Sequence, residues 1–118
     1  AYVGQYLPNW RPGRDYRKSY SAKKDQGGGV LRDLSHELDF MNWIFGGWKR
    51  VVAIGGKYSE LEIDSDDVFG LMFETTNCPL CLLQLNYLDR SIRRDIIVNT
   101  NHHVFRIDFI NNLINLHL

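Results

Sequence analysis

From Trp48 to the end of the chain, apolar and polar residues alternate in short segments that are separated by turn residues. Six of these segments have the period of two that is typical of β-strands. The links between them are short, as at Gly55-Gly56, Thr76-Asn77 and Asn111-Asn112. Parallel neighbours need a crossover of a dozen or more residues, so these links predict antiparallel pairing. The predicted strands are Lys49 to Lys57, Asp67 to Thr75, Leu80 to Asp89, Arg94 to Thr100, His103 to Asp108 and Leu113 to Leu118.

One amphipathic helix is predicted before these strands, over residues 30–46. Three glycines at 27–29 precede it, and Gly46-Gly47 suits its C-terminal cap. Its polar stripe carries Asp33, His36 and Asp39, three residues apart and therefore on one face. A carboxylate one turn from a histidine can fix the imidazole tautomer, so Asp33 and His36 are predicted to share a proton-transfer site. The apolar stripe consists of Leu31, Leu34, Leu38, Met41, Ile44 and Phe45.

The region before the helix has a short β-prone start, Ala1 to Tyr6, and then a long irregular segment, Leu7 to Gln26. A loop of that length inside a compact domain is usually functional. Together with the helix and the strands it predicts an α+β fold, a twisted and mainly antiparallel sheet with the loop and one main helix on one face.

Aromatic and basic residues alternate within that irregular segment. Aromatic faces stack on sugar rings, and arginine forks suit a carboxylate or a phosphate. Over residues 1–26 six basic residues face two acidic ones, a local balance of +4. The residues predicted to bind substrate are Trp10, Arg11, Arg14, Tyr16 and Arg17.

Composition excludes several classes of function. The 118 residues suffice for one domain or part of one, and 14 basic residues balance 14 acidic ones, which disfavours a nucleic-acid partner. No apolar run reaches the ~20 residues of a membrane span, and the start does not resemble a signal peptide. Cys78 and Cys81 fall at a predicted turn and strand start, so they are expected to be free thiols in a cytoplasmic protein. The acidic residues Asp64, Asp66 and Asp67 are predicted to form a solvated turn before a strand.

Cofactor and metal sites are not predicted within this sequence. The glycines at 27–29 lack the preceding buried strand and the spacing of a phosphate-binding loop, and a hinge that lets backbone approach a ligand suits them better. His102 and His103 are adjacent on a strand, so they point to opposite faces and cannot chelate one ion together. No metal is therefore expected.

The helix segment resembles a known pattern at Gly27 to Gly29, Asp33, His36, Asp39, Trp43 and Gly46. The chain is similar there to the C-terminal domain of the glucose-fructose oxidoreductase/inositol dehydrogenase family (Gfo/Idh/MocA). Two residues separate Asp33 from His36, where the common pattern has three. The segments Gly4 to Pro12, Ser59 to Asp67 and Leu85 to Arg90 are similar to the family's substrate loop and strand region.

The resemblance implies the dihydrodipicolinate-reductase-like C-terminal fold and a role in an NAD(P)-dependent oxidoreductase that acts on a sugar or cyclitol. It implies that His36 exchanges a proton with the substrate hydroxyl as hydride leaves the same carbon. Asp33 would bond a neighbouring hydroxyl or orient His36. NAD or NADP would be bound by a Rossmann domain before Ala1, outside residues 1–118, so this chain alone is expected to bind neither.

Two further expectations concern assembly. The segment from Leu80 to Leu88 is apolar at nearly every position, so both faces of the sheet need cover. The family packs its sheets face to face, which implies a homodimer through the face without the helix.

An alternative to the oxidoreductase function is a non-catalytic ligand-binding or assembly module that keeps the same sheet.

Overall fold

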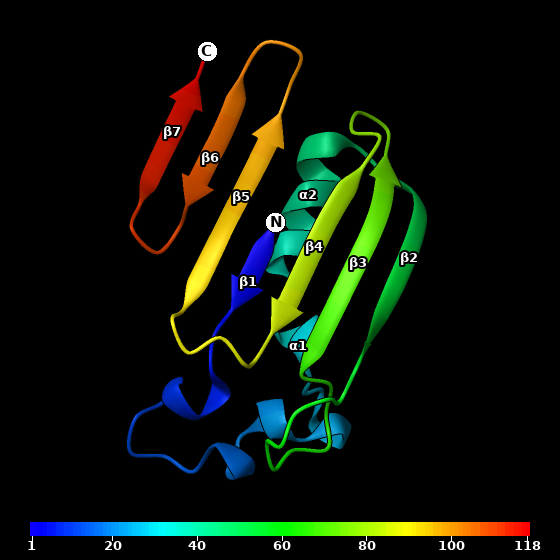
Figure 1. Ribbon diagram of the computed structural model, residues 1–118. Helices are drawn as coiled ribbons and strands as arrows, with labels where there is room; N and C mark the ends of the chain where they lie inside the picture. The colour runs from blue at the N-terminus through cyan, green and yellow to red at the C-terminus, as the bar shows by residue number, and fades with distance from the viewer.

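The computed structural model describes residues 1–118 and contains one seven-stranded sheet in the order β2-β3-β4-β1-β5-β6-β7 (Figure 1). All neighbouring strands are antiparallel except β1 and β4, which are parallel. The predicted α+β fold with a mainly antiparallel sheet is confirmed. The strands are β1 Tyr2–Gly4, β2 Trp48–Gly56, β3 Val68–Thr75, β4 Cys81–Asn86, β5 Arg93–Asn99, β6 Val104–Asp108 and β7 Leu113–His117.

Two helices cover one face of this sheet, α1 (Val30–Asp33) and α2 (His36–Phe45), and both lie behind the strands in Figure 1. The strand residues that face them alternate with outward-facing ones, as the period of two requires. On β4, Leu83 and Leu85 are buried while Leu82 and Gln84 are exposed. The core cluster is Val3, Leu7, Val30, Met41, Leu61, Leu71, Phe73, Cys81, Leu83, Leu85 and Tyr87.

The prediction of one continuous helix over residues 30–46 is wrong. α1 ends where the Leu34 N–H donates to the Val30 carbonyl oxygen, and Leu34 has φ −108° and ψ 30°, outside helical geometry. α2 begins afresh at His36 after Ser35. Asp33 and His36 therefore belong to different helices, and the spacing rule that placed them on one face does not apply.

Two of the glycines before α1 pack closely against the chain's own loops. The Gly28 N–H donates to the Lys23 carbonyl oxygen over 2.9 Å. A Cβ on Gly28 would lie 2.1 Å from the Tyr20 carbonyl oxygen, so no larger residue fits. Gly29 has φ +114°, a conformation that favours glycine. These contacts give the run a structural role, and its predicted approach to a ligand stays a prediction.

The acidic stretch before β3 is not the solvated turn that was predicted. The Asp67 side chain is fully buried and accepts the backbone N–H groups of Tyr58 and Ser59 at 2.8 and 3.0 Å. Lys57 Nζ lies 3.7 Å from the same carboxylate. Asp66 caps α1, because its Oδ2 accepts the Leu31 N–H at 2.9 Å. These carboxylates supply the hydrogen bonds that a buried loop needs.

The predicted turn and strand start at the two cysteines agree with the structure. β4 starts at Cys81 after a turn, and both cysteines are free. The pKa of the Cys81 thiol is raised to about 11, mainly by burial and secondly by the neighbouring Cys78.

None of the helices combines the length and the apolar character that crossing a membrane demands.

Candidate functional site

The irregular N-terminal segment folds into short 3-10 helices that enclose a cavity at one end of the sheet. η1 (Leu7–Asn9), η2 (Tyr16–Lys18), η3 (Tyr20–Ala22) and η4 (Lys24–Gln26) gather there, below the strands in Figure 1. We call this space the loop cavity; its volume is about 580 Å³, within the range of small-molecule sites. Its lining residues are Leu7, Pro8, Trp10, Arg11, Arg14, Asp15, Tyr16, Lys18, Ser19 and Tyr20.

Four of the five residues predicted to bind substrate line the loop cavity, and Arg17 does not. The Arg17 guanidinium bonds Asp15 Oδ1 at 2.9 Å and Glu62 Oε2 at 2.7 Å. Tyr16 also contacts this region, because its hydroxyl accepts the Glu62 N–H at 3.1 Å. Hydrogen bonds from Arg17 lower the pKa of Asp15 to about 2. Arg17 thus ties the loop to the segment before β3, and its predicted substrate contact stays a prediction that this geometry does not favour.

The charged side chains that line the loop cavity and form no ion pair are all basic. Arg11, Arg14 and Lys18 form none of the six ion pairs in the chain, whereas the carboxylate of Asp15 is occupied by Arg17. The Arg11 guanidinium lies 5.8 Å from the centre of the Tyr20 ring. Cationic forks beside aromatic faces can bind a planar or cyclic ligand that carries an anionic group.

Asp33 does not line the loop cavity but is hydrogen-bonded to a residue of its wall. Its carboxylate accepts three hydroxyl groups, from Tyr20 at 2.7 Å, Ser21 at 2.6 Å and Tyr87 at 2.9 Å. Tyr20 lines the cavity, and the Tyr87 ring meets the Trp10 ring edge to face at 5.3 Å. The pKa of Tyr87 is raised, mainly by burial and secondly by the negative charge of Asp33, so Tyr87 remains a hydroxyl donor.

His36 lies apart from this arrangement. It is exposed at the first position of α2, in a shallow groove with Ser35, Asp39 and Trp48. The predicted hydrogen-bonded pair of Asp33 and His36 is not formed, because Asp33 directs both carboxylate oxygens to the hydroxyl groups of the loop and of Tyr87. Asp39 shares the groove of His36 and forms no ion pair.

The sequence matches the family model of the GFO/IDH/MocA C-terminal domain over residues 2–101. The chain belongs to this family. The GFO/IDH/MocA domain also resembles larger solved structures. UDP-N-acetylglucosamine 3-dehydrogenase from Acidithiobacillus ferrooxidans is 19% identical with a TM-score of 0.73, over 98% of this chain and 33% of that one. No curated protein matches the sequence.

Two more structures share the fold. The WlbA dehydrogenase of Bordetella pertussis, solved with NADH and UDP-GlcNAcA, is 18% identical with a TM-score of 0.76, over 97% of this chain and 36% of that one. An oxidoreductase from Thermotoga maritima is 18% identical with a TM-score of 0.65, over 89% and 32%. The GFO/IDH/MocA domain therefore spans about a third of the length of these structures.

Two polar residues of the GFO/IDH/MocA domain escaped the sequence analysis. Tyr87 was assigned to a strand without a chemical role, and its bond to Asp33 joins residues 54 positions apart. Glu37 is buried on α2 and pairs with Arg94 of β5 at 2.9 Å. The burial of Glu37 could have been predicted from the sequence. Glu37 lies three residues after Leu34 and four before Met41, so it falls on the apolar stripe of the helix.

Proposed function

We propose that this domain binds the substrate of an NAD(P)-dependent oxidoreductase that acts on a hydroxyl group of a sugar or cyclitol, and that it dimerises the enzyme. The observation that carries the proposal is the loop cavity, whose aromatic and cationic wall is anchored to Asp33 through the Tyr20 hydroxyl. Family membership supports the reaction class, and NAD or NADP would be bound outside residues 1–118.

An anionic sugar derivative suits the loop cavity best. Arg11 and Arg14 form no ion pair in the chain. Guanidinium forks bind phosphate or carboxylate groups with two parallel hydrogen bonds. Both named sugar-nucleotide enzymes with this fold are described with UDP-linked sugars. We infer that the substrate is a nucleotide-linked or otherwise acidic sugar whose anionic group binds these arginines.

The first prediction tests that cavity in the 118-residue chain. Arg11→Ala/Arg14→Ala should weaken binding of UDP-N-acetylglucosamine at least tenfold, because two charge-assisted contacts are lost. Isothermal titration at moderate ionic strength measures the change. Arg50→Ala is the matched control, since Arg50 lies on β2 with its side chain 82% exposed and should leave the affinity unchanged. Equal binding by all three chains would contradict the proposed substrate site.

The face of the sheet away from the helices supports the dimerisation role. Val52, Met72 and Leu82 are cross-strand neighbours there and are 58%, 47% and 57% exposed. Such a row of apolar side chains on a sheet is commonly covered by another surface. A second copy of this chain is the proposed cover.

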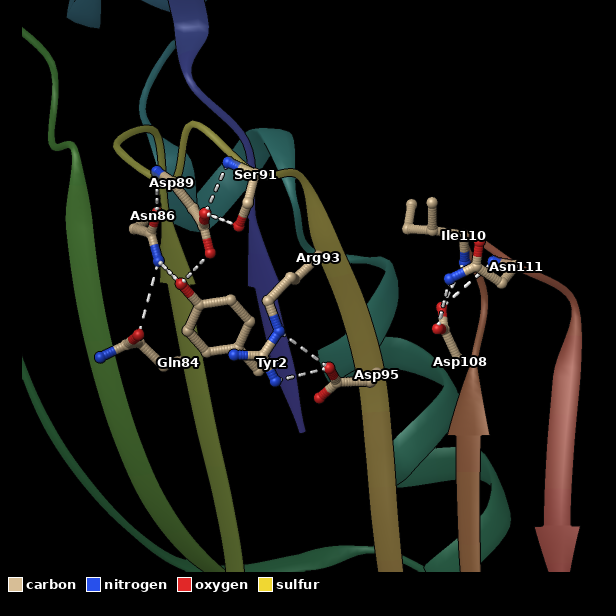
Figure 2. Close-up of polar contacts among 10 residues, drawn as sticks. All are labelled: Tyr2, Gln84, Asn86, Asp89, Ser91, Arg93, Asp95, Asp108, Ile110 and Asn111. Atoms are coloured by element: carbon tan, nitrogen blue, oxygen red, sulfur yellow. Dashed lines mark hydrogen bonds and ion pairs between the residues drawn. The ribbon is translucent and has the colours of Figure 1, made fainter.

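Polar side chains occupy the centre of the same face, on strands β1, β4 and β5 (Figure 2). The Tyr2 hydroxyl donates to Asp89 at 2.7 Å and accepts from Asn86 at 3.0 Å. Arg93 stacks on the Tyr2 ring and bonds Asp95 at 2.9 Å. Because this cluster contains both signs of charge, it is compatible with contact between two identical faces.

The second prediction concerns that face. Leu82→Asp should turn the dimer into a monomer at tens of micromolar, because an unpaired carboxylate would be buried at the interface. Sedimentation velocity measures the mass. Ile114→Asp is the control, because Ile114 is 70% exposed and lies on the other face of the sheet, the one that the helices cover. Its register partner Ile107 lies on that same face. A parent chain that sediments as a monomer would remove the dimerisation role.

One observation favours the non-catalytic alternative. Both oxygens of Asp33 are engaged by hydroxyl groups of the domain, and His36 has no hydrogen-bonded carboxylate beside it. A ligand-binding module without proton transfer would have the same features. Kinetics of a His36 variant distinguish the two functions.

A further inference from the structure

The turn from Arg11 to Arg14 brings the backbones of the two loop-cavity arginines close together. The Arg14 N–H donates to the Arg11 carbonyl oxygen at 3.1 Å, which closes the turn. Pro12 and Gly13 occupy its two central positions, and Gly13 has φ +80°, as a turn of type II requires there. The turn fixes the backbone, but each guanidinium still lies at the end of a long, exposed side chain.

Only one of these two guanidinium groups has an aromatic partner. The Arg11 guanidinium lies 5.8 Å from the centre of the Tyr20 ring, within the range of a cation–π interaction. Arg14 stacks on no aromatic ring in the chain. Neither arginine forms an ion pair. The two arginines therefore differ in how firmly the folded chain holds them, and Tyr20 makes the difference.

Asp33 fixes the far end of the Tyr20 side chain. The Tyr20 hydroxyl donates to Asp33 Oδ1 at 2.7 Å. The other oxygen, Oδ2, accepts the hydroxyl groups of Ser21 and Tyr87 at 2.6 and 2.9 Å, and both of these residues are fully buried. Two buried donors make this carboxylate a rigid acceptor, whereas Tyr20 itself is 45% exposed. The bond to Asp33 therefore determines where the Tyr20 ring lies.

The same bond strengthens the contact between ring and guanidinium. A phenol that donates to a carboxylate gains electron density on its ring, because hydrogen-bonded groups polarise one another. The more negative ring face attracts a guanidinium more strongly. A side chain that is already held also loses less conformational entropy when a ligand binds it. Asp33, Tyr20 and Arg11 thus form a series in which an anchored carboxylate places a cation in advance.

We propose that Asp33 is a positioning residue for the anionic group of the substrate and acts through Tyr20 on Arg11. This inference rests on the proposed function and deepens it, because it names the arginine that is in place before the ligand arrives. Arg14 becomes ordered only when the ligand binds. Asp33 needs no contact with His36 or with the substrate for this role.

Nuclear magnetic resonance relaxation of the arginine Nε–H groups tests the positioning in the 118-residue chain without a ligand. The Arg11 group should be more ordered than the Arg14 group. Tyr20→Phe keeps the ring and removes its bond to Asp33, so it should lower the order of Arg11 to that of Arg14. Tyr58→Phe is the matched control, since Tyr58 is an exposed tyrosine outside the loop cavity. Equal order of the two arginines in the parent, or an unchanged Arg11 in Tyr20→Phe, would overturn the proposal.

A double-mutant cycle on the affinity for UDP-N-acetylglucosamine tests the action on Arg11. Tyr20→Phe should weaken binding about threefold in the parent and in Arg14→Ala, and should have no effect in Arg11→Ala. Asp33→Asn should weaken binding in the parent and add nothing in Tyr20→Phe. The same loss in every background would mean that Tyr20 supports the loop in general, and would overturn the action on Arg11.

The two measurements separate this inference from the proposed function. If Arg11→Ala/Arg14→Ala bound UDP-N-acetylglucosamine as the parent does, the substrate site would be wrong, while the order of Arg11 in the free chain would still decide the positioning. If that variant lost affinity and Tyr20→Phe did not, the substrate site would stand and the role of Asp33 would be overturned.

Discussion

In the proposed full-length oxidoreductase, in which a nucleotide-binding domain accompanies this one, His36→Ala should lower turnover roughly 10²–10⁴-fold. That range is the usual contribution of a positioned general acid or base. Cofactor affinity should stay within about twofold of the parent, because the proposed nucleotide site lies outside residues 1–118. Steady-state absorbance of the reduced nicotinamide gives turnover, and a fluorescence titration gives cofactor affinity.

The fold should survive this change, because His36 is exposed and α2 is anchored by buried Met41 and Glu37. His102→Ala is the matched control, since His102 is an exposed histidine in the turn between β5 and β6. Turnover near the parent rate in the His36 variant would contradict catalysis by His36 and favour the non-catalytic module.

The sheet was predictable because its strands are long and alternate regularly. The period of two located β2 to β7, and short turns implied their antiparallel pairing. The position of β1 was not predictable in this way. Tyr2–Gly4 has three residues and inserts between β4 and β5, where Val3 is buried, so its pairing depends on partners more than 80 residues away.

The helix was predicted in the right place but without its interruption. A stripe of apolar residues reports which face is buried, and Leu34 fits that stripe whether or not the backbone stays helical. The interruption coincides with bonds from Tyr20, Ser21 and Tyr87 to Asp33. Tertiary contacts of this kind override local periodicity, which is why the spacing of Asp33 and His36 predicted a pair that the fold separates.

The candidate site was predictable in its composition and not in its pairing. Aromatic and basic residues in a long loop correctly indicated the walls of the loop cavity. Arg17 was grouped with them because its ion pair with Glu62 spans 45 residues and leaves no local signal. The burial of Asp67 has the same cause, since its backbone partners surround it only after the loop has folded.

The second large effect concerns the pair that fixes α2 to β5. Arg94→Ala should lower the free energy of unfolding by about 3 kcal/mol, because it leaves the Glu37 carboxylate buried without its counter-charge. That figure is the lower end of the about 3–5 kcal/mol expected when one partner of a buried pair is removed. The lower end applies because 37% of the Arg94 side chain is exposed, so water can partly replace it. Urea unfolding followed by circular dichroism measures the change.

Two variants separate this mechanism from the mere loss of an ion pair. Arg50→Ala breaks the pair with Glu74, but Arg50 is 82% exposed and its loss should cost no more than about 1 kcal/mol. Glu37→Met/Arg94→Met removes both charges and fills the space with apolar atoms, so it should recover most of the stability that Arg94→Ala loses. If Arg94→Ala were as stable as Arg50→Ala, the Glu37 carboxylate would have to be stabilised by something other than its pair with Arg94.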